Sequence, residues 1–246
     1  MANKAVKQGN PKQFIGVLVV VAVLGVGGLG YALTRPGAKP ITVDPTIPAG
    51  AAEGHLLGKA DAPVQVMEFG DFECPHCGDW ATVTEPDVRS RLVNTGIISF
   101  RYYDFPLAGF KNSWTAHLAA SCAEEQGKFW EMHDKLYAAQ NEWNELATNN
   151  PVKVIRGYAV ELGLDPKAWE DCVVTQKPAA RIKGNQAEGE RRNVSGTPTF
   201  VIGDKMLTAI SFDQFKMYVD SALAAAKGEA SKKPAKPEGA KKSAAR

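Results

Sequence analysis

Two cysteines, Cys74 and Cys77, lie two residues apart within "FGDFECPHCGDW" (69–80). A C-x-x-C pair can bind zinc, form a structural disulfide or exchange electrons with another disulfide. A zinc site needs four ligands, and neither a second C-x-x-C pair nor a closely spaced pair of histidines accompanies this one. A disulfide across so short a loop removes little chain entropy from the unfolded state. We therefore favour a redox pair.

The residues around the pair favour a thiolate at Cys74. The apolar run 63–69 is typical of a buried strand, and Pro75 suits the first position of a following helix. Cys74 then lies at a helix N-terminus, whose free N–H groups and partial positive charge stabilise a thiolate, and His76 can add a donor or a charge. A low thiol pKa stabilises the reduced form, so the disulfide becomes an oxidant. Cys77, one turn further, should be more buried and should resolve the mixed disulfide.

A long apolar segment predicts the compartment. Residues 14–33 carry no charge and are long enough to span a bilayer as a helix. Lys4, Lys7 and Lys12 precede it, so we expect residues 1–13 to be cytoplasmic and the rest of the chain to be exported. A cleaved signal peptide is the alternative, but this run is longer than its usual apolar core and no small-x-small site follows. We expect an uncleaved single-pass anchor, with the catalytic domain in the periplasm or outside the cell membrane.

The other two cysteines, Cys122 and Cys172, lie on apolar faces of predicted helices. They could be two buried free thiols or a second disulfide. Because disulfides persist in oxidising compartments, we expect a disulfide in an exported chain. The fifty residues between the two positions correspond to about 4 kcal/mol in the chain-entropy model.

The composition predicts one globular domain flanked by non-globular segments. The chain has 246 residues, 44% of them apolar, which is enough for a sizeable core. The Pro-rich stretch 34–52 predicts an extended tether, and 53–226 the domain. Residues 227–246 are basic and lack aromatic or branched apolar side chains, so we expect a disordered tail. The net charge of +2, without a basic face in the domain, gives no case for nucleic-acid binding.

The order of predicted elements is that of an α/β sandwich. A parallel pair of strands flanks a first helix that Pro86 should kink, a helical block follows, and an antiparallel hairpin and a last helix close the domain. In chain order these are the strand 63–69, the helix 75–92, the strand 97–105, the helical block at about 108–192, the hairpin around Gly203-Asp204 and the amphipathic helix 212–223.

The segment strand-"FECPHC"-helix, followed much later by "SGTPTFVIGD" (195–204), resembles the DsbA-like branch of the thioredoxin superfamily. "DFPL" (104–107) and "CAEEQGKFWEMHDKLY" (122–137) are also similar to that branch, and the resemblance covers about residues 53–226. It implies a thioredoxin fold with a helical insertion, here preceded by one transmembrane helix. It also implies a thiol–disulfide oxidoreductase that needs no prosthetic group.

The resemblance assigns roles to three further residues. Thr197 and Pro198 match the cis-proline dipeptide that faces the cysteines and pairs with the backbone of an unfolded substrate. Glu68 lies where family members often bury an acid, which could take the proton from Cys77. The alternative for Glu68 is a solvated edge of the strand. We expect Glu73, beside the nucleophile, to be solvated.

The resemblance implies an extracytoplasmic oxidase that donates the Cys74–Cys77 disulfide to unfolded or reduced exported proteins. It also implies a monomer and a membrane partner of the DsbB or VKOR type that reoxidises the pair and passes electrons to a quinone. A reductase or isomerase, with the pair reduced at rest, is the nearest alternative. A metal-binding or metal-delivery module that uses Cys74, His76 and Cys77 is a further one.

Overall fold

The computed structural model describes residues 40–208 and 210–232. The predicted cytoplasmic segment and membrane anchor, residues 1–33, and the tail from 233 onwards lie outside the described residues. Within the described part of the chain, no helix is both long and apolar enough to cross a bilayer.

A five-stranded sheet lies at the centre of the domain, with strand order β1-β3-β2-β4-β5. Strands β2 and β3 are parallel, from Val64 opposite Ile98 to Gly70 opposite Asp104, and the other pairs are antiparallel. The strands are β1 His55–Leu57, β2 Val64–Gly70, β3 Ile98–Asp104, β4 Thr199–Ile202 and β5 Lys205–Thr208. The predicted parallel pair and hairpin are confirmed. The edge strand β1 was not predicted, because three residues are too few to show a period.

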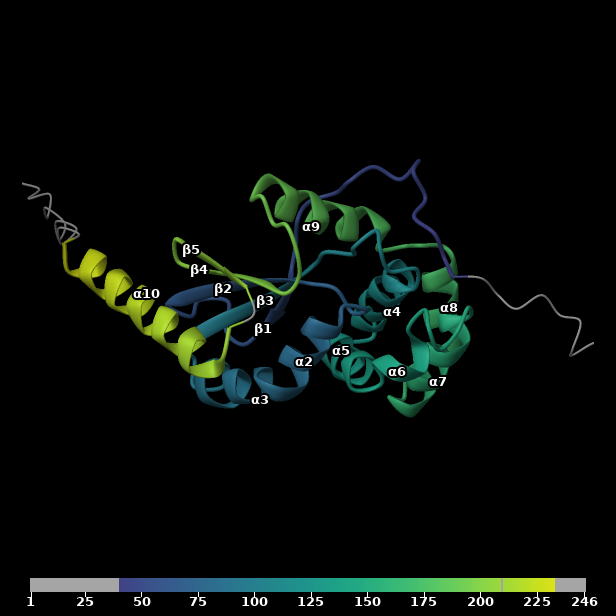
Figure 1. Cartoon of the computed structure of the whole chain (residues 1–246), viewed down its shortest axis with the longest axis horizontal. Coiled ribbons are helices and arrows are strands. Elements are labelled where there is room, and N and C mark those ends of the chain that lie inside the picture. Colours follow the sequence, from purple (N-terminus) through teal and green to yellow (C-terminus); the bar gives the residue numbers. More distant parts are fainter. Residues whose placement is uncertain (1–39, 209, 233–246) are drawn as a thin grey trace, which may run out of the picture. The chain divides into compact units, whose positions relative to one another are not determined.

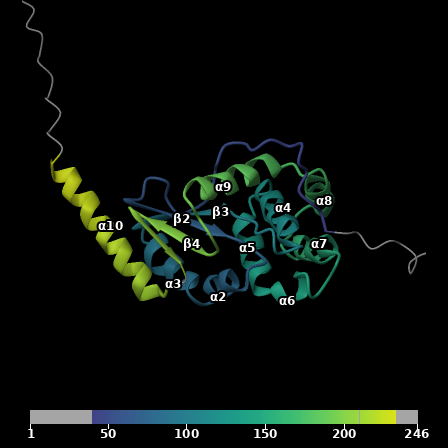
Figure 2. The ribbon, with the colours of Figure 1, turned by 45° about the horizontal axis from the view of Figure 1, so that its top comes forward.

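Helices cover both faces of the sheet, and α4 to α8 gather beside it as the predicted helical insertion (Figures 1 and 2). Helix α9 covers one face, while α2, α3 and α10 pack against the other. The helices are α2 Pro75–Val83, α3 Glu85–Val88, the π-helical turn η1 Arg89–Val93, α4 Ser113–Glu124, α5 Phe129–Ala138, α6 Gln140–Trp143, α7 Pro151–Glu161, α8 Pro166–Val174, α9 Ala179–Arg191 and α10 Phe212–Lys232.

The alternation of side chains along β2 separates two cores. Val64 and Val66 face Trp80, Val88 and further apolar side chains of α2, α3, η1 and α10. Phe69, on the opposite face, packs with Phe105 and Val194. A third cluster fills the helical insertion and includes the aromatic side chains Trp114, Phe129 and Tyr137. The strand that leads to the cysteine pair is therefore buried on both faces.

Three boundaries differ from the prediction. The expected single helix 75–92 is interrupted at Thr84 and resumes as α3, because Pro86 cannot continue the first helix. Residues 40–52 of the predicted tether are packed onto the domain: the Ile41 N–H donates to Thr115 Oγ1 at 2.9 Å, and the Gly50 N–H donates to the Ala180 carbonyl at 2.7 Å. Helix α10 ends at Lys232, beyond the predicted helix end at 223 and the predicted domain end at 226, because the alanines after residue 221 favour helix.

Candidate active site

Cys74 is the N-cap residue of α2, and Pro75 occupies the first helical turn as the sequence predicts. The backbone at Cys74 is extended (φ −69°, ψ 122°), so the chain turns from the loop after β2 into the helix at this residue. Cys74 is 5% exposed and Cys77 is fully buried, and both are free thiols. Only Cys74 therefore offers a sulfur to another protein.

Thr197, which is far from Cys74 in the sequence, lies next to it in the fold. The Thr197–Pro198 peptide bond is cis, and the Cys74 Sγ lies 3.5 Å from the Thr197 carbonyl oxygen. The pKa of Cys74 is lowered to about 6. The hydrogen bond from the Cys77 thiol is the main cause, opposed by burial and assisted by Thr197 and by the backbone N–H groups of Cys77 and His76. Cys74 is thus largely a thiolate at neutral pH.

The surroundings of Cys77 act in the opposite direction. Burial raises the pKa of Cys77 well above its ordinary value, and the neighbouring charges of Cys74 and Glu68 raise it further. The backbone N–H of Asp71 donates to the Cys77 Sγ at 3.5 Å and opposes this shift. One thiol of the pair is therefore ionised and the other is protonated, which suits an attacking or leaving sulfur beside a resolving one.

Glu68 lies on β2, between Tyr102 of β3 and Phe200 of β4, and is 1% exposed. This burial rules out a solvated edge. Burial raises the pKa of Glu68 well above its usual range, and the charge of Glu85 raises it further, while Arg89 opposes the shift. Glu68 therefore favours the neutral acid form, which can give a proton to the resolving thiol, whereas its carboxylate form can take one back.

Glu73 corrects the prediction of a solvated side chain. It is 4% exposed, and its carboxylate accepts hydrogen bonds from the backbone N–H groups of Asn112, at 2.7 Å, and of Glu145. Burial raises the pKa of Glu73, and these hydrogen bonds oppose the shift. Glu73, which directly precedes Cys74, thus binds the backbone at Asn112 and Glu145 of the helical insertion.

A buried polar network next to the pair was missed in the sequence. Asp104 accepts hydrogen bonds from Asn185 at 2.7 Å and contacts His117 at 2.7 Å and His55 at 3.1 Å. Burial lowers the pKa of His117, but the hydrogen bond to Asp104 and the nearby Asp71 carboxylate, 3.7 Å away, outweigh this and raise it to about 9. Asp71 directly follows β2, and Asp104 is the last residue of β3. Because the carboxyl ends of two adjacent parallel strands lie at the same edge of the sheet, the sequence could have predicted that these two acids lie close together.

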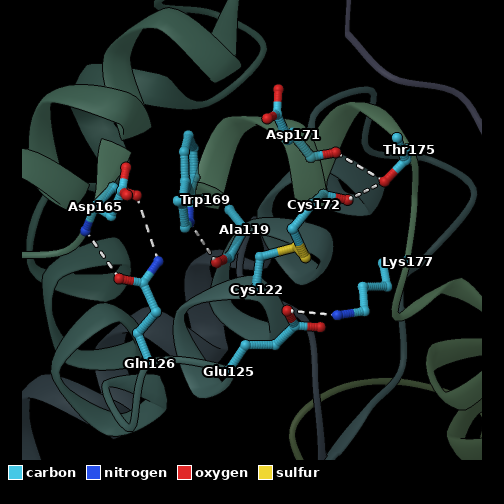
Figure 3. The surroundings of a disulfide bond; sticks show 10 residues. All are labelled: Ala119, Cys122, Glu125, Gln126, Asp165, Trp169, Asp171, Cys172, Thr175 and Lys177. Carbon is cyan, nitrogen blue, oxygen red and sulfur yellow. Dashed lines mark hydrogen bonds and ion pairs between the residues drawn. A yellow bond between two sulfur atoms is a disulfide. The ribbon is translucent and has the colours of Figure 1, made fainter. Parts of the chain in front are cut away.

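Cys122 of α4 and Cys172 of α8 form the second disulfide, as expected, with an S–S distance of 2.02 Å and Cα atoms 5.9 Å apart. Figure 3 shows that polar contacts around the sulfurs also join the two helices and the residues just after them. The Trp169 indole N–H donates to the Ala119 carbonyl at 3.0 Å, and Lys177 pairs with Glu125 at 2.8 Å. This disulfide therefore belongs to the helical insertion and lies within its packing.

Comparisons with known proteins agree with this geometry. The family described as Thioredoxin matches residues 51–221. The Na(+)/H(+) antiporter NhaA 3 of Salinispora tropica is 35% identical over 170 residues, which are 69% of this chain, and the chain spans 24% of the antiporter's length. Disulfide bond formation protein D of Bacillus subtilis is 26% identical over 180 residues, covering 68% of this chain and 76% of that protein. The crystal structure of Wolbachia pipientis alpha-DsbA1 superposes with a TM-score of 0.65 at 17% identity, over 74% of this chain and 96% of that one, a likeness of fold.

Proposed function

Because the chain belongs to the thioredoxin family and has the fold of DsbA, we propose that it is a thiol–disulfide oxidoreductase that works as an oxidase. It donates the Cys74–Cys77 disulfide to reduced proteins outside the cytoplasm. The difference between the two thiols carries this proposal. Cys74, at the helix N-terminus, has a pKa of about 6, and Cys77 has a raised one. A reduced form stabilised by the Cys74 thiolate makes the corresponding disulfide oxidising.

The reaction begins when a substrate thiolate attacks the Cys74 sulfur. The Cys74–Cys77 bond breaks, Cys77 leaves with the electron pair as a thiolate, and a proton from the neutral Glu68 neutralises it. A second substrate thiolate then attacks the substrate sulfur of the mixed disulfide. The substrate leaves with a new disulfide, two electrons remain on the reduced pair, and Cys74 departs as the stabilised thiolate.

The surface around Cys74 supports recognition of an unfolded chain. Thr197, which precedes the cis-proline Pro198, lies against the nucleophile, so an extended substrate backbone can pair beside it while its cysteine reaches the sulfur. Loops held by Glu73 border the same region. The substrates that we propose are therefore reduced or unfolded exported proteins rather than small molecules.

The location and the partners follow from the chemistry. The apolar segment 14–33 supports a location outside the cytoplasm, and the disulfide of the insertion is of a kind that oxidising compartments preserve. Each turnover leaves the pair reduced. A quinone-linked membrane protein of the DsbB or VKOR type is the partner that we propose for its reoxidation.

Stoichiometric oxidation of a reduced, unfolded protein by the oxidised domain tests this function. We expect one new substrate disulfide per protein molecule, and none with Cys74→Ser. If the protein reduces insulin disulfides faster than it oxidises substrate thiols, it is a reductase and not an oxidase. One tightly held equivalent of copper or zinc after mild reduction would favour a metal-binding module instead.

A further inference from the structure

Proton exchange at Cys77 needs a path to solvent. Cys77 is fully buried, and Glu68 is only 1% exposed. In the reaction above, Cys77 takes up a proton when it leaves, and it must lose that proton before it can attack again. Glu68 can serve both steps only if its own proton is exchanged with water, because a buried acid without an outlet acts once.

A second buried carboxyl, Glu85, is close enough to Glu68 for its charge to raise the pKa of Glu68. It is 1% exposed and begins α3, directly after the interruption of the helix at Thr84. The Oε2 atoms of Glu68 and Glu85 are both buried, and neither has a hydrogen-bond partner among the residues that the structure describes. Glu68 shares its strand face with Val66, in an otherwise apolar layer. Two unsatisfied carboxyl oxygens in such a layer are costly, which favours a functional reason for them.

Helix α5 provides a route outwards from Glu85. The His133 Nε2 lies 3.9 Å from the Glu85 Oε2, and it too lacks a hydrogen-bond partner within the described chain. The other ring nitrogen, Nδ1, lies 2.9 Å from the Asp134 Oδ1, and the Asp134 side chain is 54% exposed. The gap of 3.9 Å is one that a bridging water or a small movement closes. Polar atoms thus extend from Glu85 to the surface.

We propose that Glu85 and His133 relay protons between Glu68 and solvent at Asp134, so that Cys77 can be protonated and deprotonated in every cycle. This inference rests on the proposed function and deepens it. When Cys77 leaves as a thiolate, the Glu68 proton moves to it, and Glu68 regains a proton from solvent through His133 and Glu85. Before Cys77 attacks, Glu68 loses its proton to solvent through Glu85 and His133, and its carboxylate then takes the proton of Cys77, so proton and charge balance in both directions.

Arg89 explains why the two acids can share a site. Its guanidinium lies 2.7 Å from the Glu85 Oε1 and 2.6 Å from the Asp134 Oδ1. Arg89 pairs with the Glu85 carboxylate, while burial and the charge of Glu85 raise the pKa of Glu68, so Glu68 carries the exchangeable proton. The titratable and charged groups that face Glu85 are Glu68 of β2, Arg89 of η1, and His133 and Asp134 of α5.

Resolution of a mixed disulfide with glutathione isolates the step at Cys77. Reduced protein reacts with oxidised glutathione first at Cys74, and Cys77 then attacks the mixed disulfide and releases glutathione. We expect Glu68→Gln to slow this release ~100-fold, and Glu85→Gln ~10-fold with a displaced pH–rate profile, since water can still reach Glu68 slowly. The first step should be unchanged, because Cys74 makes no contact with the relay. Glu131→Gln is the matched control, since Glu131 is an exposed acid on α5 paired with Lys128.

The outcomes separate the relay from a scaffold role. The relay is overturned if Glu85→Gln releases glutathione at the natural rate with the natural pH–rate profile. It is also overturned if the substitution slows the reaction at Cys74 and the release by Cys77 equally. If Glu85→Gln does not fold, Asp134→Asn decides, because its exposed site tolerates the change; a slower release supports the relay, and an unchanged one overturns it. If the protein releases glutathione through the relay but does not oxidise unfolded substrates, the relay stands and the proposed oxidase function is wrong.

Discussion

Cys74 and Cys77 begin one helix, whereas Cys122 and Cys172 lie fifty residues apart on two packed helices. At the first pair, free N–H groups, Thr197 and the partner thiol stabilise a thiolate. At the second pair, the surroundings consist of helix–helix packing, an indole hydrogen bond and a lysine–glutamate ion pair (Figure 3). The same side chain therefore meets an environment that favours its ionised form in one place and its bonded form in the other.

This difference shows that position along a helix, rather than the cysteine itself, determines reactivity. A thiolate at a helix N-terminus meets unpaired N–H donors, whereas a thiolate within a helix meets backbone groups that are already bonded. We expect the first pair to open and close in each cycle and the second to stay closed.

The largest effect should come from the nucleophile. Cys74→Ser should abolish oxidation of an unfolded substrate, because no other thiol of the described chain is both ionised and accessible. Cys77→Ser should instead accumulate substrate linked to Cys74, because the resolving thiol is missing. Non-reducing electrophoresis detects the trapped complex, and oxidation at the natural rate by either variant would remove the contrast between the pairs.

Removal of the second pair should change stability rather than activity. The double substitution Cys122→Ala with Cys172→Ala should lower the free energy of unfolding by about 4 kcal/mol, because the closed loop of fifty residues no longer restricts the unfolded chain. Denaturant titration measures the loss, and the rate of substrate oxidation serves as its control. A large fall in activity in the still-folded variant would show that the second disulfide takes part in exchange.

The smallest effect concerns His76. This residue is exposed, and its backbone N–H is among the groups that lower the pKa of Cys74. His76→Ala keeps that N–H, so we expect the pKa of Cys74 to rise by less than about one unit, equivalent to about 30 mV or less in reduction potential. Thiolate absorbance against pH measures the shift. A larger rise would assign the main stabilisation to the imidazole instead.

Much of the fold could be predicted because its signals are local. The buried strand β2, Pro75 at the start of α2 and the Gly203-Asp204 turn each follow from a few neighbouring residues. The second disulfide could be expected from the compartment and the number of cysteines. The edge strand β1 and the docking of residues 40–52 could not, because they depend on contacts with distant parts of the chain.

The site shows the same limit. Cys74 and Cys77 are marked by their spacing, and Thr197-Pro198 by resemblance. The burial of Glu73 and Glu85 has no local signal, because an acid beside a loop or a proline is usually solvated. What buries them is the approach of α5 and of the loops of the insertion, far away in the sequence. Charge networks of this kind are visible only after the chain is folded.

The reduction potential of the Cys74–Cys77 pair, measured against glutathione from pH 4.5 to 8.5, tests the central claim most directly. With a Cys74 pKa of about 6 and a raised Cys77 pKa, reduction takes up two protons below pH 6 and one above it. We expect a slope of about 59 mV per pH unit below pH 6 and about 30 mV above it, with a potential at pH 7 well above about −270 mV, the level of a general reductant. A constant slope of about 59 mV through this range, with a potential near about −270 mV, would contradict the account.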